Sequence, residues 1–305
     1  MLNSNPIFKM KNIDYLIRTI TVRLIHIIVI VLNKVGHGRL NFVNRFFSKI
    51  VDILIPKREI QISIEGFKFV YSGRDRGMGH SLFITGKYEQ EETDFIKSIL
   101  KPHMTYVNIG ANFGYYSILA AKNVKTVYAF EPEPYNYSLV EKNIKLNELD
   151  NVVVEKLAIS NNSNKTLLFK DEANFGNPSL SKKNIMTGHS STEVKTTTID
   201  EYFKDKPVID VLQMDTQGNE AAILEKAELV FKNCNKIVFE FWPYGLKNME
   251  SSPLKLLQTL HSKGYSISEI DKILKPIEPN NFLTLIDKLE NQKSGRGFTT
   301  LYAWR

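Results

Sequence analysis

The chain has 305 residues, of which 43% are hydrophobic and 24% are charged, and this composition excludes extended disorder and low-complexity architecture. A single cysteine, Cys234, excludes an intramolecular disulfide and any cysteine-cluster zinc or iron–sulfur site. The net charge of +7 is concentrated in residues 1–58, where ten Lys and Arg residues against two Asp residues give +8. The remaining residues therefore sum to −1, so a basic arm precedes a near-neutral body. Nucleic-acid enzymes more often spread cations around the active cleft, and we expect no nucleic-acid partner.

Apolar residues recur at helical spacing from Ile13 to Val31 and predict an amphipathic helix over residues 12–34. Its uncharged stretch, Leu24–Leu32, is far shorter than the about 20 residues that a membrane span needs, and no cleavage site typical of a signal peptide follows it. Two alternatives remain for this arm. It packs as a cap on the body or at a subunit interface, or it lies on an anionic membrane surface. We therefore expect a cytoplasmic protein, with peripheral contact to the inner face of the membrane under the second alternative.

The segment 59–100 leads into the main domain. Alternating apolar residues over Glu59–Tyr71, interrupted by Glu65-Gly66, predict a β-hairpin. The glycine-rich segment Gly73–Gly86 predicts a loop. A helix is expected from Lys87 to about Leu100, because acids fill its first turn and Lys101-Pro102 ends it.

The next segment has the pattern of a nucleoside-binding unit. It predicts a strand at 105–109, a glycine turn at 110–114, a helix at 115–122 and a strand at 126–130 that ends at Glu131. Glycines let the backbone approach a ligand closely, and a carboxylate after the second strand can accept hydrogen bonds from both ribose hydroxyls. The spacing Gly110-x-Asn112-x-Gly114 lacks the dinucleotide fingerprint, which argues against a dinucleotide-dependent oxidoreductase.

Strands and helices continue to alternate to the end of the chain. We predict strands at 152–157, 166–169, 208–214, 236–241, 265–269 and 299–304, helices at 134–147, 198–203, 220–231 and 253–263, and loops at 174–192 and 271–297, the second of them mobile. This alternation is typical of an α/β fold with a mostly parallel sheet covered on both faces. We divide the chain into a basic helical arm (1–58), a hairpin with a lead-in helix (59–100) and a Rossmann-like domain (101–305).

Polar residues follow four of these strands at one edge of the sheet. Asn108, Glu131, Asp215 and Glu240 all stand at carboxyl ends, where ligands of parallel sheets bind. That coincidence predicts a site there.

At these residues the chain resembles the FkbM family of S-adenosylmethionine-dependent methyltransferases. The resemblance covers roughly residues 87–241 and includes the segments 106–117, 129–134, 212–220 and 237–240 together with Asn143, Asn147, Asn151-Val152 and Ala158. It implies a seven-stranded, Rossmann-like class I methyltransferase sheet whose last strand is antiparallel. It also implies O-methylation of a hydroxyl, often on a sugar or a polyketide-type molecule.

The resemblance also implies roles for particular residues. The turn residues Gly110, Asn112 and Gly114 border the methionine part of the cofactor, and Glu131 holds its ribose. The adenine lies against Leu157 and Ala158, and Asp215 lies beside the reacting methyl group.

Asn108 departs from the family, which usually has Asp there. The amide keeps a hydrogen bond but loses a charge that favours the cofactor's ammonium group, so we expect weaker binding.

A sugar hydroxyl is weakly acidic, so a general base assists its methylation. Asp215 is the first candidate, with a cap for the helix near Glu220 as its structural alternative, and Glu240 is the second candidate, with a strand-end role as its alternative. His80 is a third candidate base or a substrate contact, and it is otherwise an exposed loop residue. Tyr88 and Trp242 present faces that could stack on a sugar, or they belong to the core.

No metal site is predicted, because the six histidines do not cluster. The main rival is a non-catalytic protein that keeps the methyltransferase fold as a binding or scaffolding module, which Asn108 and the basic arm motivate. Methylation of flipped bases is disfavoured because the chain lacks an Asn-Pro-Pro-Tyr type of motif.

Overall fold

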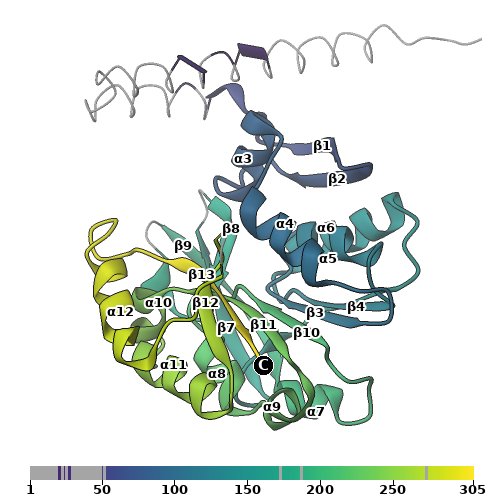
Figure 1. The fold of residues 1–305 in the computed structure, drawn as a ribbon. Coiled ribbons are helices and arrows are strands. Elements are labelled where there is room, and N and C mark those ends of the chain that lie inside the picture. The colour runs from purple at the N-terminus through teal and green to yellow at the C-terminus, as the bar shows by residue number, and fades with distance from the viewer. Residues whose placement is uncertain are drawn as a thin grey trace, which may run out of the picture.

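The computed structural model describes residues 20, 21, 24, 27, 28, 50, 53–171, 174–185, 188–271 and 274–305. Its centre is a seven-stranded sheet (Figure 1) with the order β12-β13-β11-β10-β3-β4-β5. The strands are β3 (Thr105–Ile109), β4 (Thr126–Phe130), β5 (Val152–Glu155), β10 (Val211–Met214), β11 (Lys236–Phe241), β12 (Ser266–Glu269) and β13 (Thr299–Trp304). From β5 to β11 neighbouring strands pair parallel, whereas β13 pairs antiparallel with both β11 and β12. The predicted class I methyltransferase sheet is therefore confirmed.

Helices cover both faces of this sheet, and strand residues alternate between two cores. On β3, Tyr106 belongs to one core and Val107 to the other. The same alternation on β10 places Val211 in the first core and Leu212 in the second. The first core contains α4 (Gln90–Ile99), α5 (Tyr115–Ala121) and α6 (Pro134–Leu146); the second contains α7 (Ile199–Phe203), α8 (Glu220–Glu225), α9 (Glu228–Asn233), α10 (Pro243–Asn248), α11 (Pro253–Ser262) and α12 (Phe282–Glu290).

The predicted hairpin forms from β1 (Glu59–Ile64) and β2 (Phe67–Ser72), which pair antiparallel across the turn at Glu65-Gly66. Asn143 of α6 and Asn147, the C-cap of that helix, bind the free edge of β2 as a neighbouring strand would. The side chain of Asn143 exchanges hydrogen bonds with the backbone of Val70 (2.6 and 2.8 Å), and Asn147 does the same with Lys68 (2.8 and 2.6 Å). Asn143 also donates to the carbonyl of Phe113 at 2.9 Å. The hairpin is thereby fixed to the glycine turn.

The predicted loop at 73–86 is wrong, because residues 78–85 form helix α3 (Met78–Thr85). Glycine-rich composition concealed the helix, which is stabilised by tertiary packing of Met78, Leu82 and Phe83 in the first core. Gly86, with φ of 72°, ends the helix in the left-handed conformation that glycine adopts readily.

The predicted loop at 174–192 is also wrong. Its residues contribute two strands to a second, four-stranded sheet of order β6-β9-β7-β8, formed by β6 (Ala158–Ile159), β7 (Lys165–Asp171), β8 (Asn174–Ser179) and β9 (His189–Thr197). Seven residue pairs join β7 to β9. On β9 only Val194 and Thr196 are buried. Because most of that strand is polar, the apolar alternation that marks a strand is missing from its sequence.

The C-terminal region holds three further corrections. The expected mobile loop at 271–297 contains α12, whose buried residues Phe282, Leu285, Ile286 and Leu289 have helical spacing. The single helix predicted at 220–231 is divided into α8 and α9 by an irregular junction at Lys226-Ala227. Helix α10 follows Trp242 and was not predicted.

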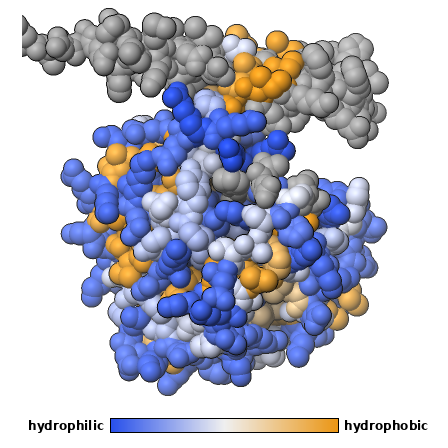
Figure 2. All heavy atoms as spheres, turned by 180° about the vertical axis from the view of Figure 1, so that it is seen from behind, coloured by the Kyte–Doolittle hydropathy of each residue, from blue (hydrophilic) through white to orange (hydrophobic). Residues whose placement is uncertain are grey.

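The predicted arm helix lies mostly outside the described residues. Those described within it, at positions 20, 21, 24, 27 and 28, are helical. Ile20, Leu24, Ile27 and Ile28 are 48–56% exposed, and Figure 2 shows the hydrophobic group of atoms beside the grey part of the arm. Nothing among the described helices combines the length and apolar character needed to span a bilayer.

Candidate active site

A cavity of about 820 Å³ opens at the carboxyl ends of the central strands. The ends of β3, β4, β10 and β11 bring Asn108, Glu131, Asp215 and Glu240 into its wall, as the strand order requires. Its volume lies within the range of about 300–1,000 Å³ that small-molecule sites occupy. The predicted clustering of these four residues is therefore what the structure shows.

Glu131 is held by two backbone amides. Its Oε2 accepts a hydrogen bond from the N–H of Asn112 at 2.7 Å, and its Oε1 accepts from the N–H of Glu133 at 2.9 Å. Asn112 adopts a left-handed conformation (φ 54°), which aims its N–H at the carboxylate. Burial of the carboxyl outweighs these two donors and raises its pKa to about 8.

Asn108 is buried, and its Nδ2 donates to Oγ of Ser117 on α5 at 2.9 Å. The two turn glycines have different surroundings. A Cβ on Gly110 would lie 1.9 Å from the carbonyl oxygen of Asp215, so this glycine allows the loops after β3 and β10 to touch. A Cβ on Gly114 would instead meet Val140 of α6 at 3.2 Å, and Gly114 is not among the residues that line the cavity.

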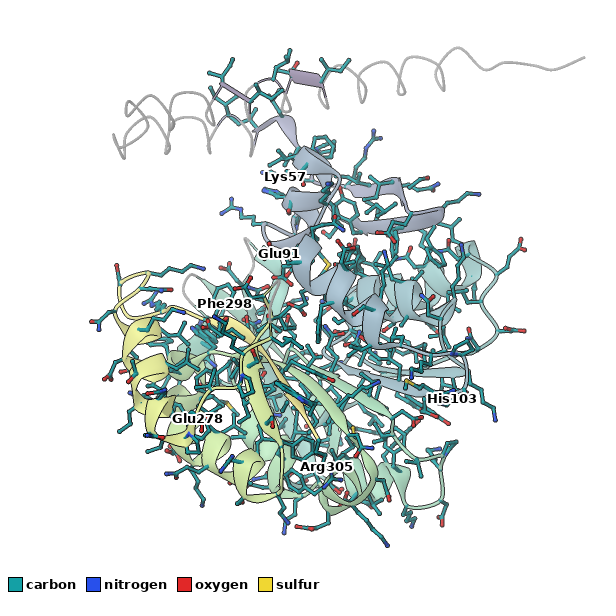
Figure 3. All side chains as sticks on the ribbon, in the orientation of Figure 1. Lys57, Glu91, His103, Glu278, Phe298 and Arg305 are labelled. Atoms are coloured by element: carbon teal, nitrogen blue, oxygen red, sulfur yellow. The ribbon has the colours of Figure 1, made fainter. Side chains whose placement is uncertain are left out.

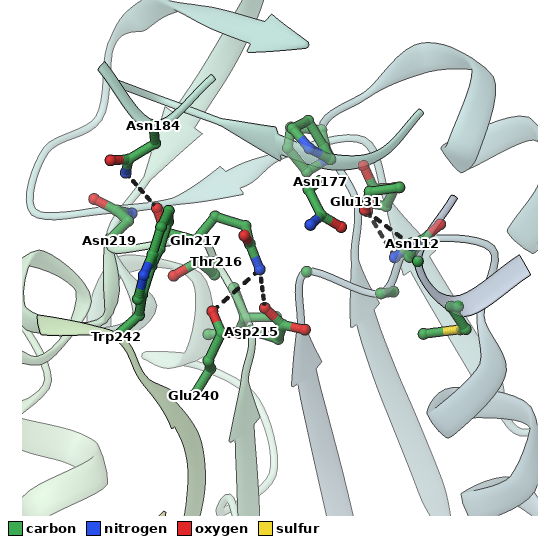
Figure 4. Close-up of a pocket in the computed structure, with 18 of the residues that line it drawn as sticks. Asn112, Glu131, Asn177, Asn184, Asp215, Thr216, Gln217, Asn219, Glu240 and Trp242 are labelled. Atoms are coloured by element: carbon green, nitrogen blue, oxygen red, sulfur yellow. Dashed lines mark hydrogen bonds between the residues drawn. The ribbon is translucent and has the colours of Figure 1, made fainter. Parts of the chain in front are cut away.

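Asp215 and Glu240 form a pair that is joined by one amide group (Figure 4). Nε2 of Gln217 donates to Oδ1 of Asp215 at 2.8 Å and to Oε2 of Glu240 at 3.1 Å. Burial, reinforced by the neighbouring charge of Glu89, raises the pKa of Asp215 to about 7. Burial and the charge of Asp215 raise the pKa of Glu240 well above its ordinary value. The pKa of Asp215 therefore lies near neutral pH, where a general base is most effective.

Asp215 does not cap α8, which was the structural alternative to its role as a base. The N-cap of α8 is Asn219, which makes no side-chain cap hydrogen bond. The loop is shaped instead by Glu220, whose Oε1 accepts from the N–H and the hydroxyl of Thr216 at 2.8 and 2.7 Å. Asp215 is thus left to face the cavity.

The predicted apolar wall and aromatic contacts also lie at the cavity, where Leu157, Ala158, Tyr88 and Trp242 all line it. Trp242 is 7% exposed, and its Nε1 is buried without a hydrogen-bond partner among the described residues. His80 lies on α3 and is not among the lining residues, so its candidate role as base or substrate contact loses its basis.

Several cavity residues were given no role from the sequence. Gln217 has a φ of 55° and joins the two acids. Glu89 has a φ of 37° and accepts a hydrogen bond from the hydroxyl of Tyr116 at 2.9 Å. Positive φ in residues other than glycine costs free energy and is concentrated at functional sites, but a sequence carries no sign of it. The segment before β13 adds Phe298, which is labelled in Figure 3, to the lining of the cavity.

Comparison with known proteins gives one family and a set of distant structures. A model of the methyltransferase FkbM domain matches residues 108–267. No curated protein matches the chain. The chain is similar to a crystal structure of methyltransferase FkbM from Methylobacillus flagellatus KT, with 12% identity over 74% of this chain and 52% of that chain and a TM-score of 0.40.

Two further solved structures show the same level of similarity. One is TYW2 of M. jannaschii, solved in complex with AdoMet, with 18% identity over 81% of this chain and 86% of that chain and a TM-score of 0.41. The other is the crystal structure of the "putative transferase PH0793" from Pyrococcus horikoshii, with 14% identity over 82% of this chain and 73% of that chain and a TM-score of 0.44. The family match spans just over half of this chain and the strand order agrees with it. The chain belongs to the FkbM methyltransferase domain family, whose cofactor is S-adenosylmethionine.

Proposed function

We propose that this protein transfers a methyl group from S-adenosylmethionine to a hydroxyl of a sugar or glycan. The observation that carries the proposal is the shared cavity. A carboxylate held by backbone amides, Glu131, and a carboxyl pair with raised pKa, Asp215 and Glu240, line the same cavity of about 820 Å³. One cavity thereby offers a place for a nucleoside and a group that can accept a proton.

The residues on the nucleoside side fit the cofactor. Glu131 retains lone pairs for ribose hydroxyls beyond the two N–H donors that position it. Leu157, Ala158 and Ile159 give an apolar wall for adenine. Gly110 lines the cavity without a side chain, so the backbone of the turn after β3 can approach a ligand closely.

The residues on the acceptor side fit proton removal. When bound, S-adenosylmethionine supplies the methyl group: the hydroxyl oxygen forms the new C–O bond, and the C–S bond breaks with its electron pair left on sulfur. Asp215 accepts the hydroxyl proton, for which a pKa of about 7 is well matched. Gln217 fixes the orientation of its carboxylate, and Glu240 stabilises the protonated pair.

The position of Trp242 favours a sugar as the methyl acceptor. Its ring lines the cavity and offers an apolar face of the kind on which sugar rings stack. Its unpartnered Nε1 can donate a hydrogen bond to an acceptor hydroxyl. The aromatic ring of Tyr88 lines the same cavity.

The test is transfer of labelled methyl from S-adenosylmethionine to a panel of sugars and glycans, with Asp210→Asn as the matched control for Asp215→Asn. Asp210 lies just before the amino end of β10, where it accepts from the N–H of Thr105. Transfer by wild type and by the control, but not by Asp215→Asn, is expected. Cofactor binding with no transfer to any hydroxyl acceptor would overturn the O-methylation proposal. The scaffold alternative, which the neutral Asn108 favours, predicts no cofactor binding.

We also propose that the arm contacts an anionic membrane. An interfacial membrane helix is favoured over a cap packed on the body because four apolar residues of the arm are exposed: Ile20, Leu24, Ile27 and Ile28. Residues 1–58 supply the cations that an anionic membrane attracts. Flotation with vesicles rich in phosphatidylserine should recover wild type and lose Leu24→Glu. Leu283→Glu is the control, since Leu283 on α12 is 56% exposed and Leu24 is 55% exposed. Equal flotation of both variants, or binding to neutral vesicles alone, would contradict this contact.

A further inference from the structure

The cavity has the neutral amide of Asn108 at the position where the resemblance implies an anion for the ammonium group of the cofactor. The inference below rests on the proposed function. The methionine part of S-adenosylmethionine carries an ammonium group. At the end of β3, the side chain of Asn108 carries no charge, and its Nδ2 donates a hydrogen bond to Oγ of Ser117. A buried ammonium requires an ionised or strongly polar acceptor close by.

Three of the acids that line the cavity already have proposed roles at the ribose or in proton transfer. Glu131 accepts from the backbone N–H groups of Asn112 and Glu133. Asp215 and Glu240 are both bound to the amide of Gln217. Asp171 stands on β7, in the second sheet. Glu89 is the remaining acid among the described lining residues.

Glu89 lies at the same end of α5 as Asn108. Its Oε2 accepts from the hydroxyl of Tyr116 at 2.9 Å, and Asn108 donates to Ser117, the next residue of that helix. Tyr116 is 7% exposed, so the carboxylate of Glu89 is fixed by a buried partner. The N-cap position of α4 and the left-handed φ of 37° hold the backbone of Glu89 in this place.

We propose that the carboxylate of Glu89 binds the ammonium group of the cofactor's methionine part and supplies the charge that Asn108 lacks. Tyr116 is a positioning residue in this arrangement, because it orients the carboxylate through one hydrogen bond. The anion would then lie on the segment that enters α4 rather than at the end of β3, and both segments contact α5.

The test compares two ligands that differ at the amino-acid end. S-adenosylhomocysteine carries the ammonium and carboxylate, whereas 5′-methylthioadenosine keeps the adenosine and the thioether but lacks both. By calorimetry, Glu89→Gln should weaken S-adenosylhomocysteine about tenfold or more and change the affinity for methylthioadenosine less than about twofold. Glu91→Gln is the matched control: Glu91 is an exposed acid in the first turn of the same helix and does not line the cavity.

Two more variants sharpen the result. Tyr116→Phe should weaken S-adenosylhomocysteine by less than Glu89→Gln does, again without affecting methylthioadenosine. Adding Asn108→Asp to Glu89→Gln should restore much of the lost affinity, because it returns one negative charge to the same end of α5.

Each contrary outcome has a separate meaning. Unchanged binding of S-adenosylhomocysteine to Glu89→Gln, or an equal loss for both ligands, would overturn the role of Glu89. Failure of folded wild type to bind either ligand would overturn the proposed function, and this inference with it.

Discussion

The two ends of the cavity hold their carboxyl groups in different ways. At the β4 end, Glu131 has a backbone N–H on each oxygen, and its position is set by the turn after β3. At the β10 and β11 ends, Asp215 and Glu240 share a single side-chain amide from Gln217. Backbone donors cannot move far without deforming the turn, whereas a glutamine side chain can rotate. We therefore propose that the Glu131 end holds the ribose of the cofactor and that the Asp215–Glu240 end accepts the proton.

The largest effect that follows from this difference is on turnover. Asp215→Asn removes the proton acceptor but keeps the size of the side chain, so methyl transfer should fall by about 10²–10⁴-fold. The dissociation constant of S-adenosylhomocysteine should change little, because Asp215 does not belong to the nucleoside end. Turnover close to that of wild type would make Asp215 a structural residue.

Removal of the Glu131 carboxyl, at the β4 end of the cavity, should affect cofactor binding first. Glu131→Ala should weaken cofactor binding by about 1–3 kcal/mol, measured by calorimetry. Glu155→Ala is a suitable control, because Glu155 stands at the end of neighbouring β5 and bonds Tyr202 rather than lining the cavity. An unchanged dissociation constant for Glu131→Ala would remove Glu131 from the site.

The pH dependence of turnover tests whether Asp215 is the proton acceptor. The base must be ionised to accept a proton, and the pKa of Asp215 is about 7. Turnover under saturating substrates should therefore fall as pH drops below about 7, by about tenfold per unit. A profile that stays flat from pH 8 down to pH 5 would exclude Asp215 as the base.

The smallest expected effect is on stability. Burial raises the pKa of Asp215 from 3.8 to about 7, so this group contributes stability that is fully present below pH 3.8 and is lost as pH rises through about 7. Asp215→Asn removes that loss and should therefore stabilise the protein more at pH 8 than at pH 5. Denaturant unfolding at the two pH values measures the difference. A difference of the opposite sign would mean that the ionised carboxylate is stabilised in the fold.

The main sheet and its site could be predicted because their signals are local in the sequence. Apolar strands ending in Asn108, Glu131, Asp215 and Glu240, with helices between them, determine which side chains meet at one edge. The fold therefore follows from the order of elements, and the strand order confirms it.

Features fixed by distant contacts could not be predicted in this way. Strand β9 is mostly polar and exists through its pairing with β7, so its sequence resembles a loop. Gln217 and Glu89 line the cavity, and both adopt a positive φ that is uncommon for residues other than glycine and cannot be read from the sequence. Helix α12 differs, since its apolar spacing was present in the sequence and the nearby turn motifs outweighed it.

The most direct test of the account is a calorimetric titration of the folded protein with S-adenosylmethionine and S-adenosylhomocysteine, carried out on wild type and on Glu131→Ala. We expect wild type to bind both ligands in the micromolar range and the variant to bind both more weakly. Absence of binding by wild type, with its folded state verified, would contradict the account and would leave the methyltransferase fold as a scaffold.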